Sequence, residues 1–239
     1  MNIKNKTILV TGTNRGIGRA LLEEALRLGA QRIYAATRSP FTHPDPRVTP
    51  IILDVTDAAQ IRKAAANIAT LDILINNAGI AQYDDLSDRS MLNRHLAVNF
   101  FGIYDLTTAF LPSLKRSRGA VVNILSIVAL APLPLIASYS ISKAAAFSLT
   151  QSFRAFLAGQ GVRVHAVLTG PVDTDINRGL DIPKASPESA AGAIFAGVEL
   201  EEEDIFPDPM SASLAEGWRT GAVKAMERQN ASFVAAQPA

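Results

Sequence analysis

Short apolar runs alternate with longer segments rich in Ala and Leu along most of this chain, and this alternation is the strongest constraint on its fold. The runs contain few polar residues, which is typical of strands that helices cover on both faces. Repeated strand–helix units of this length predict an α/β fold with a parallel, doubly wound sheet. We expect strands at 7–12, 32–37, 50–55, 71–79, 120–126, 162–170 and 203–208, and helices at 18–29, 57–69, 89–114 and 138–158.

Length and composition limit what the chain can be. With 239 residues, 48% of them hydrophobic, it can bury one large core without a second domain. Its 23 basic and 22 acidic residues give a net charge of +1, so neither nucleic acid nor an anionic membrane is an expected partner. Residues 1–239 are therefore expected to form a single domain. Residues 207–239 would be a C-terminal extension that covers the site, contacts another subunit or frays.

Nothing in the sequence indicates a membrane segment or a metal site. The apolar run before Gly12 is too short for the core of a signal peptide, and no stretch approaches the roughly 18 apolar residues of a membrane span. The absence of Cys excludes disulfides, thiolate metal sites and a cysteine nucleophile. His43, His95 and His165 lack metal-ligand spacing, so we interpret them as incidental. We expect a soluble, cytoplasmic protein that binds no metal.

A glycine-rich turn joins the first predicted strand to the first predicted helix. In TGTNRGIG, residues 11–18, Gly12 would permit a tight turn and Gly16 would let backbone N–H groups approach a pyrophosphate. Gly18 would allow the helix to pack closely on the strand, and the helix N-terminus adds partial positive charge. After the first strand of an alternating α/β pattern, this spacing favours the dinucleotide-binding (Rossmann) arrangement over a purely structural turn.

The second predicted strand indicates which dinucleotide binds. An acidic residue about 20 positions beyond the glycines would hydrogen-bond a ribose 2′-OH, but residues 35–39, AATRS, contain no carboxylate. Arg38 stands there instead, and Arg15 lies within the glycine turn. Two guanidinium groups suit a 2′-phosphate because their planar forks match its oxygens. We predict NADP(H) in preference to NAD(H), the alternative being that both arginines are solvated surface residues.

Several further motifs occur in a characteristic order. The sequence NNAG at 76–79 ends the fourth predicted strand, Ser126 ends the fifth, and Tyr139-x-x-x-Lys143 opens the next helix. With TGxxxGxG at 11–18, these motifs give the chain a resemblance to the short-chain dehydrogenases/reductases from about residue 4 to residue 206. The resemblance implies an NADP(H)-dependent oxidoreductase that transfers a hydride between nicotinamide and a small-molecule carbonyl or secondary alcohol substrate.

The resemblance also implies roles for individual residues. Tyr139 would be the general acid/base, Lys143 its electrostatic partner and a ribose ligand, and Ser126 would orient the substrate carbonyl. Asn99 would hold a water in the proton relay, and Thr169 departs from the proline usual at its position. The cofactor-binding residues implied by the glycine turn and the resemblance are Gly12, Asn14, Arg15, Gly16, Ile17, Gly18, Arg38, Asp54, Val55, Asn77, Ala78, Gly79, Tyr139, Lys143, Gly170, Val172 and Thr174.

The same resemblance implies a homodimer or homotetramer. The helices at 89–114 and 138–158 would form the contact between subunits. Ala144, Phe147 and Phe153 are the small and aromatic residues expected to pack across a two-fold axis.

Electrostatics gives a reason for a tyrosine and a lysine to share a helix face. Positions i and i+4 of a helix lie on one face, about 6 Å apart along the axis. An unperturbed tyrosine pKa of about 10 is poorly matched to proton transfer near neutral pH. An ammonium about 5 Å from a phenolate, at an effective dielectric near 20, would favour the phenolate by roughly 3 kcal/mol, or about two pKa units. We therefore expect Lys143 to lower the pKa of Tyr139.

Two other functions fit parts of the chain. Ser140 and Lys143 spell SxxK, the signature of penicillin-recognising enzymes, but the accompanying SDN and KTG elements are not matched. A protein of this fold could also bind NADP(H) as a sensor or regulatory module without turning it over. Such modules typically lack the tyrosine or the lysine, and this chain retains both. The apolar loop at 127–138 either lines a pocket for an apolar carbonyl substrate or packs into the core.

Overall fold

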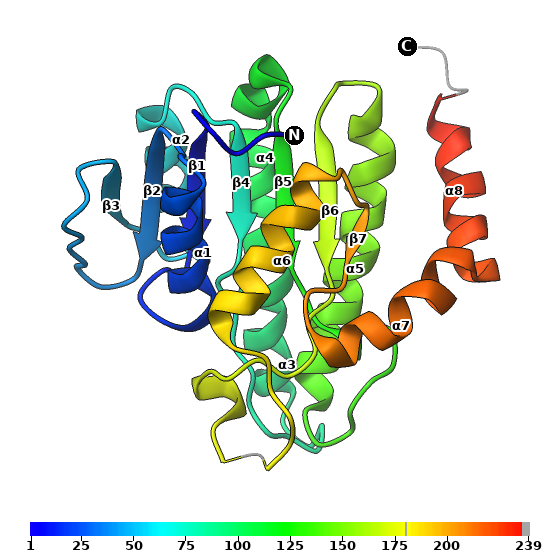
Figure 1. Cartoon of the computed structure of the whole chain (residues 1–239). Coiled ribbons are helices and arrows are strands. Elements are labelled where there is room, and N and C mark those ends of the chain that lie inside the picture. The colour runs from blue at the N-terminus through cyan, green and yellow to red at the C-terminus, as the bar shows by residue number, and fades with distance from the viewer. Residues whose placement is uncertain (180, 236–239) are drawn as a thin grey trace.

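Seven parallel strands form one sheet in the order β3-β2-β1-β4-β5-β6-β7 (Figure 1). The computed structural model describes residues 1–179 and 181–235. Its strands are β1 (Thr7–Thr11), β2 (Arg32–Thr37), β3 (Val48–Ile52), β4 (Ile73–Asn76), β5 (Ala120–Ile124), β6 (Arg163–Val167) and β7 (Asp204–Ile205). The direction of winding reverses between β1 and β4. The predicted doubly wound parallel sheet is thus confirmed.

Helices cover both faces of this sheet. They are α1 (Gly16–Arg27), α2 (Ala58–Asn67), α3 (Arg89–Leu96), α4 (Gly102–Ser117), α5 (Ala137–Ala158), α6 (Pro187–Glu199), α7 (Pro209–Thr220) and α8 (Ala222–Ala235). In Figure 1, α1 and α6 lie in front of the sheet, and α2, α4 and α5 lie behind it. Within residues 1–179 and 181–235, no helix has the length and apolar character needed to cross a membrane.

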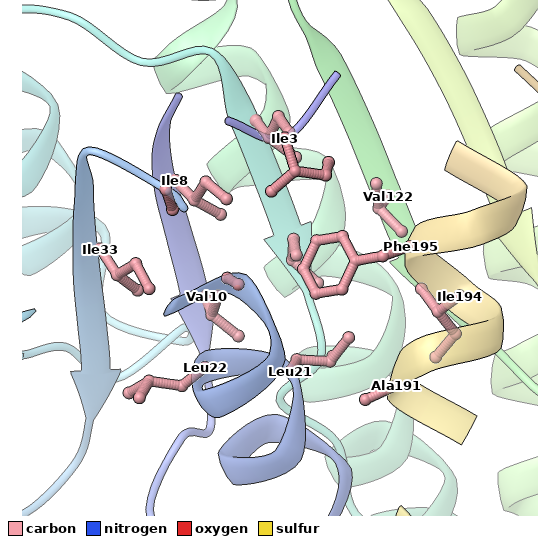
Figure 2. Packing of buried hydrophobic residues seen from close by; sticks show 14 of the residues in the cluster. Ile3, Ile8, Val10, Leu21, Leu22, Ile33, Val122, Ala191, Ile194 and Phe195 are labelled. Atoms are coloured by element: carbon pink, nitrogen blue, oxygen red, sulfur yellow. The ribbon is translucent and has the colours of Figure 1, made fainter. Parts of the chain in front are cut away.

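Each face of the sheet is closed by its own apolar cluster. On the side of α1 and α6, the buried side chains of Leu21 and Phe195 pack over Val10 and Val122 (Figure 2). On the other side, Phe110 of α4 belongs to a cluster that also includes residues of α2 and α5. Burial of apolar surface stabilises the fold by about 25 cal/mol per Å². Because both faces are covered in this way, the loops at the strand ends are left to carry polar groups.

Helix α6 forms in a region to which the sequence analysis assigns no element. Its N-cap is Ser186, whose hydroxyl accepts from the backbone N–H of Ser189 at 3.0 Å, and Pro187 occupies its first position. Both residues are favoured at these positions of a helix. Ile194 and Phe195 then place its apolar side on the sheet. A serine followed by proline was therefore an available signal for this helix.

The predicted elements differ from the observed ones mainly where strands end. The strand predicted at 71–79 is only the four residues of β4, and the one predicted at 203–208 is the two residues of β7. The strand predicted at 50–55 starts earlier and ends earlier, at 48–52. The helix predicted at 89–114 is divided by a π-helical turn, Ala97–Phe101, between α3 and α4. The predicted strand ranges therefore included residues of the adjoining loops, such as Leu53 and Phe206.

The described part of the C-terminal extension consists of α7, α8 and the segment before them; residues 236–239 lie outside the described residues. A buried ion-pair cluster attaches α8 to the sheet edge. The ammonium of Lys224, which is 1% exposed, lies 2.6 Å from the carboxylate of Asp204 and 2.9 Å from that of Glu227. Arg154 of α5 pairs with the same two carboxylates. Buried charges require such partners, so the cluster ties α8 to α5 and β7.

The extension also covers Phe147, which the sequence analysis places at a subunit contact. Phe147 is 6% exposed, and its ring centre lies 5.5 Å from that of Trp218 in α7. The Trp218 indole N–H donates to the carboxylate of Asp204 at 2.7 Å, which fixes the indole. The prediction was wrong for Phe147 because a later segment of its own chain covers it. Phe153 is partly buried and stacks on Tyr104 of α4.

Candidate active site

The glycine turn follows β1 at the point where the winding of the sheet reverses. Gly12 has a φ of +72° and Gly16 a φ of +54°, in the left-handed region that favours glycine. A Cβ atom at Gly18 would lie 2.0 Å from the carbonyl oxygen of Gly12. The backbone path therefore requires glycine at all three positions of the motif, and α1 approaches the turn more closely than a side chain would allow.

Polar groups from two adjacent strands hold this turn. Asn77 donates from Nδ2 to the carbonyl oxygens of Thr11 at 2.8 Å and Gly12 at 3.2 Å. The hydroxyl of Thr11 accepts from the backbone N–H groups of Asn77 at 3.0 Å and Ala78 at 2.9 Å. Two predicted cofactor residues, Asn77 and Ala78, thus adjoin the turn. The side chain of Asn77 contacts the backbone of the turn, a role that the sequence analysis did not foresee.

The turn and the start of α1 fit the diphosphate of a dinucleotide. Arg15 is the N-cap residue of α1, and its side chain makes no hydrogen bond to the first helical turn. The backbone N–H groups of that turn are therefore open to an anion. The hydroxyl of Thr13 is buried and has no hydrogen-bond partner among the described residues. A Cβ atom at Gly16 would lie 3.1 Å from the side chain of Thr174, which therefore flanks the turn. These groups suit the NADP(H) that the resemblance implies.

The two arginines predicted to bind a 2′-phosphate have different surroundings. Arg15 is exposed, and its guanidinium pairs with the carboxylate of Asp175 at 2.5 Å. Arg38 directly follows β2, is exposed, and has no ion-pair partner within 1–179 and 181–235. Of these two arginines, Arg38 is therefore the one without a competing carboxylate among the described residues.

Asp54 and Val55, predicted to contact the adenine, follow the neighbouring strand. Thr37 and Ile52 are register partners at the ends of β2 and β3, so the chain leaves the sheet at adjacent points near Arg38 and Asp54. Asp54 accepts from the backbone N–H of Thr56 at 2.9 Å, which fixes the loop. Val55 is buried and packs against Gly102, the first residue of α4. A Cβ atom at Gly102 would lie 2.9 Å from the Val55 side chain.

Three of the predicted catalytic side chains meet beyond the end of β5. Tyr139 and Lys143 lie in the first two turns of α5, and Ser126 follows β5 by two residues. The ammonium of Lys143 lies 5.6 Å from the centre of the Tyr139 ring and donates to the carbonyl oxygen of Ile124 at 2.7 Å. The hydroxyl of Ser126 accepts from the backbone N–H of Val128 at 3.3 Å and lies near enough to the phenol to lower the pKa of Tyr139. A tyrosine, a lysine and a serine are thereby brought together at the carboxyl edge of the sheet.

Burial shifts the pKa values of both titratable groups away from their charged forms. It raises the pKa of Tyr139 to about 12, against a smaller lowering by the Ser126 hydroxyl. It lowers the pKa of Lys143, which is 4% exposed, to about 8. The expectation that Lys143 lowers the pKa of Tyr139 was therefore wrong for this structure. The loss of solvation is the dominant cause, and the group that lowers this pKa is the Ser126 hydroxyl. The ammonium of Lys143 lies beside the ring and donates to a backbone carbonyl.

Asn99 lies in the π-helical turn and is fully buried. Its side-chain amide donates to the carbonyl oxygen of Ile80 at 2.9 Å, and its side-chain oxygen accepts from the N–H of Ile80 at 2.9 Å. A Cβ atom at Gly79 would lie 3.2 Å from Oδ1 of Asn99 and 3.8 Å from Nζ of Lys143. Gly79, Asn99 and Lys143 therefore adjoin one another, as a shared site requires. Turns of π-helix occur frequently at functional sites.

The segment after β6 supplies the remaining predicted cofactor residues. The N–H of Gly170 donates to the carboxylate of Asp208 at 2.7 Å, and a Cβ atom at Gly170 would lie 2.5 Å from that carboxylate. The carbonyl oxygen of Val172 accepts from the side chain of Asn177 at 2.8 Å. The N-terminus of α7 thus holds the backbone at Gly170, a link that no local sequence pattern indicated.

Two residues of the glycine turn are placed differently from the others. Asn14 is exposed, whereas Ile17 is partly buried against the core cluster under α1. A cleft of ≈ 580 Å³ opens between α1 and residues 173–188, and Gly16 and Thr174 are among its lining residues. It borders the turn and does not extend to Tyr139.

Two polar residues that contact Asn99 or Tyr139 were not predicted from the sequence. The hydroxyl of Ser142 accepts from the amide of Asn99 at 2.9 Å and donates to the carbonyl oxygen of Tyr139 at 2.7 Å. His95, interpreted as incidental, is 0% exposed, and its ring meets that of Tyr139 edge-on at 6.4 Å. The available signal was spacing, because His95 precedes Asn99 by four positions and so shares its helix face.

Comparisons with known proteins show which family the chain resembles. A family profile described as short chain dehydrogenase matches residues 6–184. Estradiol 17-beta-dehydrogenase 2 from Rattus norvegicus is 30% identical over 191 residues, which are 73% of this chain and 50% of that protein, so the chain spans half the length of this relative.

Two solved structures are similar over most of the chain. A short chain dehydrogenase from Burkholderia cenocepacia J2315 in complex with NADP has a TM-score of 0.88 at 36% identity, covering 96% of this chain and 98% of that chain. The NADPH-bound carbonyl reductase from chicken fatty liver has a TM-score of 0.74 at 27% identity, covering 81% of this chain and 90% of that chain.

Adding a single methyl group at Gly18 should disrupt the turn. In Gly18→Ala, the new Cβ would meet the Gly12 carbonyl oxygen at 2.0 Å, so α1 must move away from β1. We expect a lower Tm and a Kd for NADPH raised about tenfold or more, measured by thermal unfolding and fluorescence titration. Gly159→Ala is the control, because no atom lies within 4 Å of that Cβ position. Wild-type Tm and Kd in Gly18→Ala would contradict the prediction.

Proposed function

The chain belongs to the short-chain dehydrogenase family, and we propose that it uses NADP(H) to interconvert a carbonyl compound and a secondary alcohol. The observation that carries this proposal is the meeting of Ser126, Tyr139 and Lys143 beside Gly79. Open α/β sheets bind ligands at this edge. The similar structures that hold NADP or NADPH support the choice of cofactor.

Tyr139 is the proton donor in the direction of reduction. A pKa of about 12 keeps its hydroxyl protonated near neutral pH. NADPH held at this edge would supply a hydride for the substrate carbon. The Tyr139 hydroxyl gives its proton to the substrate oxygen. The hydroxyl of Ser126 donates to the same oxygen as negative charge develops there. In alcohol oxidation the same groups act in reverse, and Tyr139 becomes the base.

Lys143 stabilises the phenolate that remains after Tyr139 gives up its proton. A pKa of about 8 leaves its ammonium mostly charged near neutral pH. The ammonium lies 5.6 Å from the centre of the Tyr139 ring, and two charges at about this separation attract by roughly 3 kcal/mol at an effective dielectric near 20. The ammonium thus stabilises the phenolate more than the neutral phenol, so its effect grows as the proton is transferred. Asn99 would hold the water through which the proton on Tyr139 is replaced.

The cofactor is held along the carboxyl edge of the sheet. The α1 N-terminus and the glycine turn would bind the diphosphate, and Lys143 would bind the nicotinamide ribose. Arg38 would bind the 2′-phosphate. The adenine and nicotinamide contacts would come from Asp54 and Val55 at one end and from Asn77, Ala78, Gly79, Gly170, Val172 and Thr174 at the other.

A non-catalytic NADP(H) sensor of the same fold is less well supported. Such a module has no need for a phenol, a hydroxyl and a buried ammonium gathered at one point. The similar proteins are named as a dehydrogenase and a carbonyl reductase. The proton donor therefore provides the sharpest test between the two functions.

Removing the phenol hydroxyl should abolish turnover but not cofactor binding. In Tyr139→Phe, we expect the kcat for carbonyl-dependent NADPH oxidation to fall by about 10²–10⁴, because the proton donor is lost. The Kd for NADPH should stay close to that of the wild type. Tyr34→Phe, a change on β2 within the core, is the matched control. Undiminished turnover in Tyr139→Phe would refute the assignment.

Removing the Arg38 guanidinium should weaken NADPH selectively. In Arg38→Ala, we expect the Kd for NADPH to rise about tenfold or more, since a charged hydrogen bond contributes roughly 1.5–3 kcal/mol. The Kd for NADH, which has no 2′-phosphate, should be almost unchanged. Arg32→Ala, at the opposite end of the same strand, is the control. An equal loss of affinity for both cofactors would argue against a 2′-phosphate site.

The rate of reduction should fall at alkaline pH. The ammonium of Lys143 is the protonated form, so it is present below its pKa of about 8 and lost above it. We expect kcat/KM for carbonyl reduction, measured at saturating NADPH between about pH 6 and 10, to decrease as pH rises through about 8. Any residual activity of Lys143→Arg should lack this decrease, because guanidinium stays charged. A wild-type profile that is flat over this range would contradict the assignment.

A further inference from the structure

His95 lies on α3 with both ring nitrogens engaged. Nδ1 lies 2.9 Å from the carbonyl oxygen of Met91, and Nε2 lies 3.2 Å from the backbone N of Gln82. A carbonyl oxygen can only accept and a backbone N–H can only donate, so Nδ1 carries the proton and Nε2 accepts. The imidazole is thus neutral and in a single tautomer. Its Nε2 is the acceptor for a backbone group that lies 13 residues away in sequence.

His95 and Asn99 hold the same stretch of backbone. They lie one helical turn apart, and they engage Gln82 and Ile80, respectively. The loop that leaves β4 is therefore hydrogen-bonded at two positions, at Gln82 by His95 of α3 and at Ile80 by Asn99 of the π-helical turn. Side chains that bind backbone groups of irregular segments order those segments, because such groups otherwise require water.

The same loop also carries Asp84, whose side chain caps the N-terminus of α5. The N-cap residue of α5 is Ile136, which has no polar side chain to accept from the first N–H groups. Both carboxylate oxygens of Asp84 accept instead from the N–H of Ser138, at 3.1 and 3.2 Å. The N–H of Asp84 donates to the carbonyl oxygen of Leu135 at 3.2 Å, which joins the two segments. A carboxylate at a helix N-terminus also interacts favourably with the helix dipole.

Tyr139 follows Ser138 directly, so these contacts bear on the proton donor. The backbone that carries the phenol is fixed by Asp84, and the loop carrying Asp84 is fixed by His95. The His95 ring also meets the Tyr139 ring edge-on, at 6.4 Å and an interplanar angle of 70°. Small displacements of a catalytic group reduce rates steeply, by up to about 10² for 1 Å.

We propose that His95 is a positioning residue for Tyr139, acting through the hydrogen bond that its Nε2 accepts from Gln82. This inference rests on the proposed function of Tyr139 as proton donor. The competing interpretation is that the ring of His95 only fills space beside Tyr139.

Two substitutions at one position separate these interpretations. His95→Phe keeps an aromatic ring beside Tyr139 but removes the acceptor for the Gln82 N–H. His95→Gln removes the ring but keeps an acceptor, because the glutamine side-chain oxygen extends about as far from the backbone as Nε2. We expect kcat for carbonyl reduction to fall about ten- to hundredfold in His95→Phe and to remain within about threefold of wild type in His95→Gln. The Kd for NADPH should change little in either.

Hydrogen exchange gives a readout that does not depend on turnover. Peptides covering residues 80–86 and 136–140 should exchange faster in His95→Phe than in wild type, and His95→Gln should restore most of the protection. The control is His165→Phe, a change at another buried histidine, which lies in β6 and whose Nδ1 contacts the carbonyl oxygen of Glu202, just before β7. It should leave kcat and the exchange of these peptides unchanged.

The outcomes decide between the interpretations. Loss of kcat and protection in His95→Gln, with both retained in His95→Phe, would overturn the proposal in favour of ring packing. Equal retention in both variants would show that His95 has no positioning role. If the wild-type protein reduces no carbonyl compound, the proposed function fails, while hydrogen exchange still shows whether the Nε2 acceptor orders the loop and the start of α5.

Discussion

The site depends on how closely helix α1 approaches the end of β1. The backbone of Gly18 lies so near the carbonyl oxygen of Gly12 that no side chain fits between them. This approach places the positive end of α1 over the point where the winding of the sheet reverses, which is where such sheets open a crevice. Asn77 then links the turn to β4, so the binding surface for the diphosphate is held from two strands. A dinucleotide laid along this edge must pass the ends of β4 and β5, where the side chains that we propose to be catalytic lie.

Burial has opposing consequences for the two titratable groups of the site. Without solvent, the pKa of Tyr139 rises to about 12 and that of Lys143 falls to about 8, so each neutral form is favoured. A tyrosine in this state is a proton donor that holds its proton until negative charge develops on a neighbouring oxygen. The same low-polarity surroundings strengthen the attraction between the ammonium and a newly formed phenolate. In the proposed reaction, Lys143 would therefore act most strongly after proton transfer has begun, rather than by lowering the pKa of the resting tyrosine.

The alternation of apolar runs and helical segments was sufficient to predict the sheet, because continuous apolar strands leave few other folds. The types and positions of the site residues could also be proposed from local motifs. The boundaries could not, since β4 ends at Asn76 and residues 77–79 enter a loop whose backbone is held by the Thr11 hydroxyl, a contact between distant parts of the chain. The π-helical turn that divides the 89–114 helix contains Asn99, which bonds to the backbone of Ile80, and hydrophobic periodicity gives no signal for such a contact. Phe147 was misplaced for a similar reason, because its partner Trp218 lies in a C-terminal segment with little local signal.

Carboxylates from distant parts of the chain fix both sides of the catalytic group. Asp84 accepts from the N–H of Ser138 at the start of α5, and Asp208 accepts from the N–H of Gly170 after β6. Both are bonds from a backbone N–H to a side chain, so neither is part of the backbone hydrogen bonding of the sheet or of a helix. Each satisfies a backbone donor that would otherwise need water, and each is a charge-assisted bond, which is stronger than a neutral one. The active-site loops are thus ordered by side-chain contacts rather than by secondary structure. The C-terminal extension belongs to this arrangement, because the residue that caps α7 also anchors the backbone at Gly170.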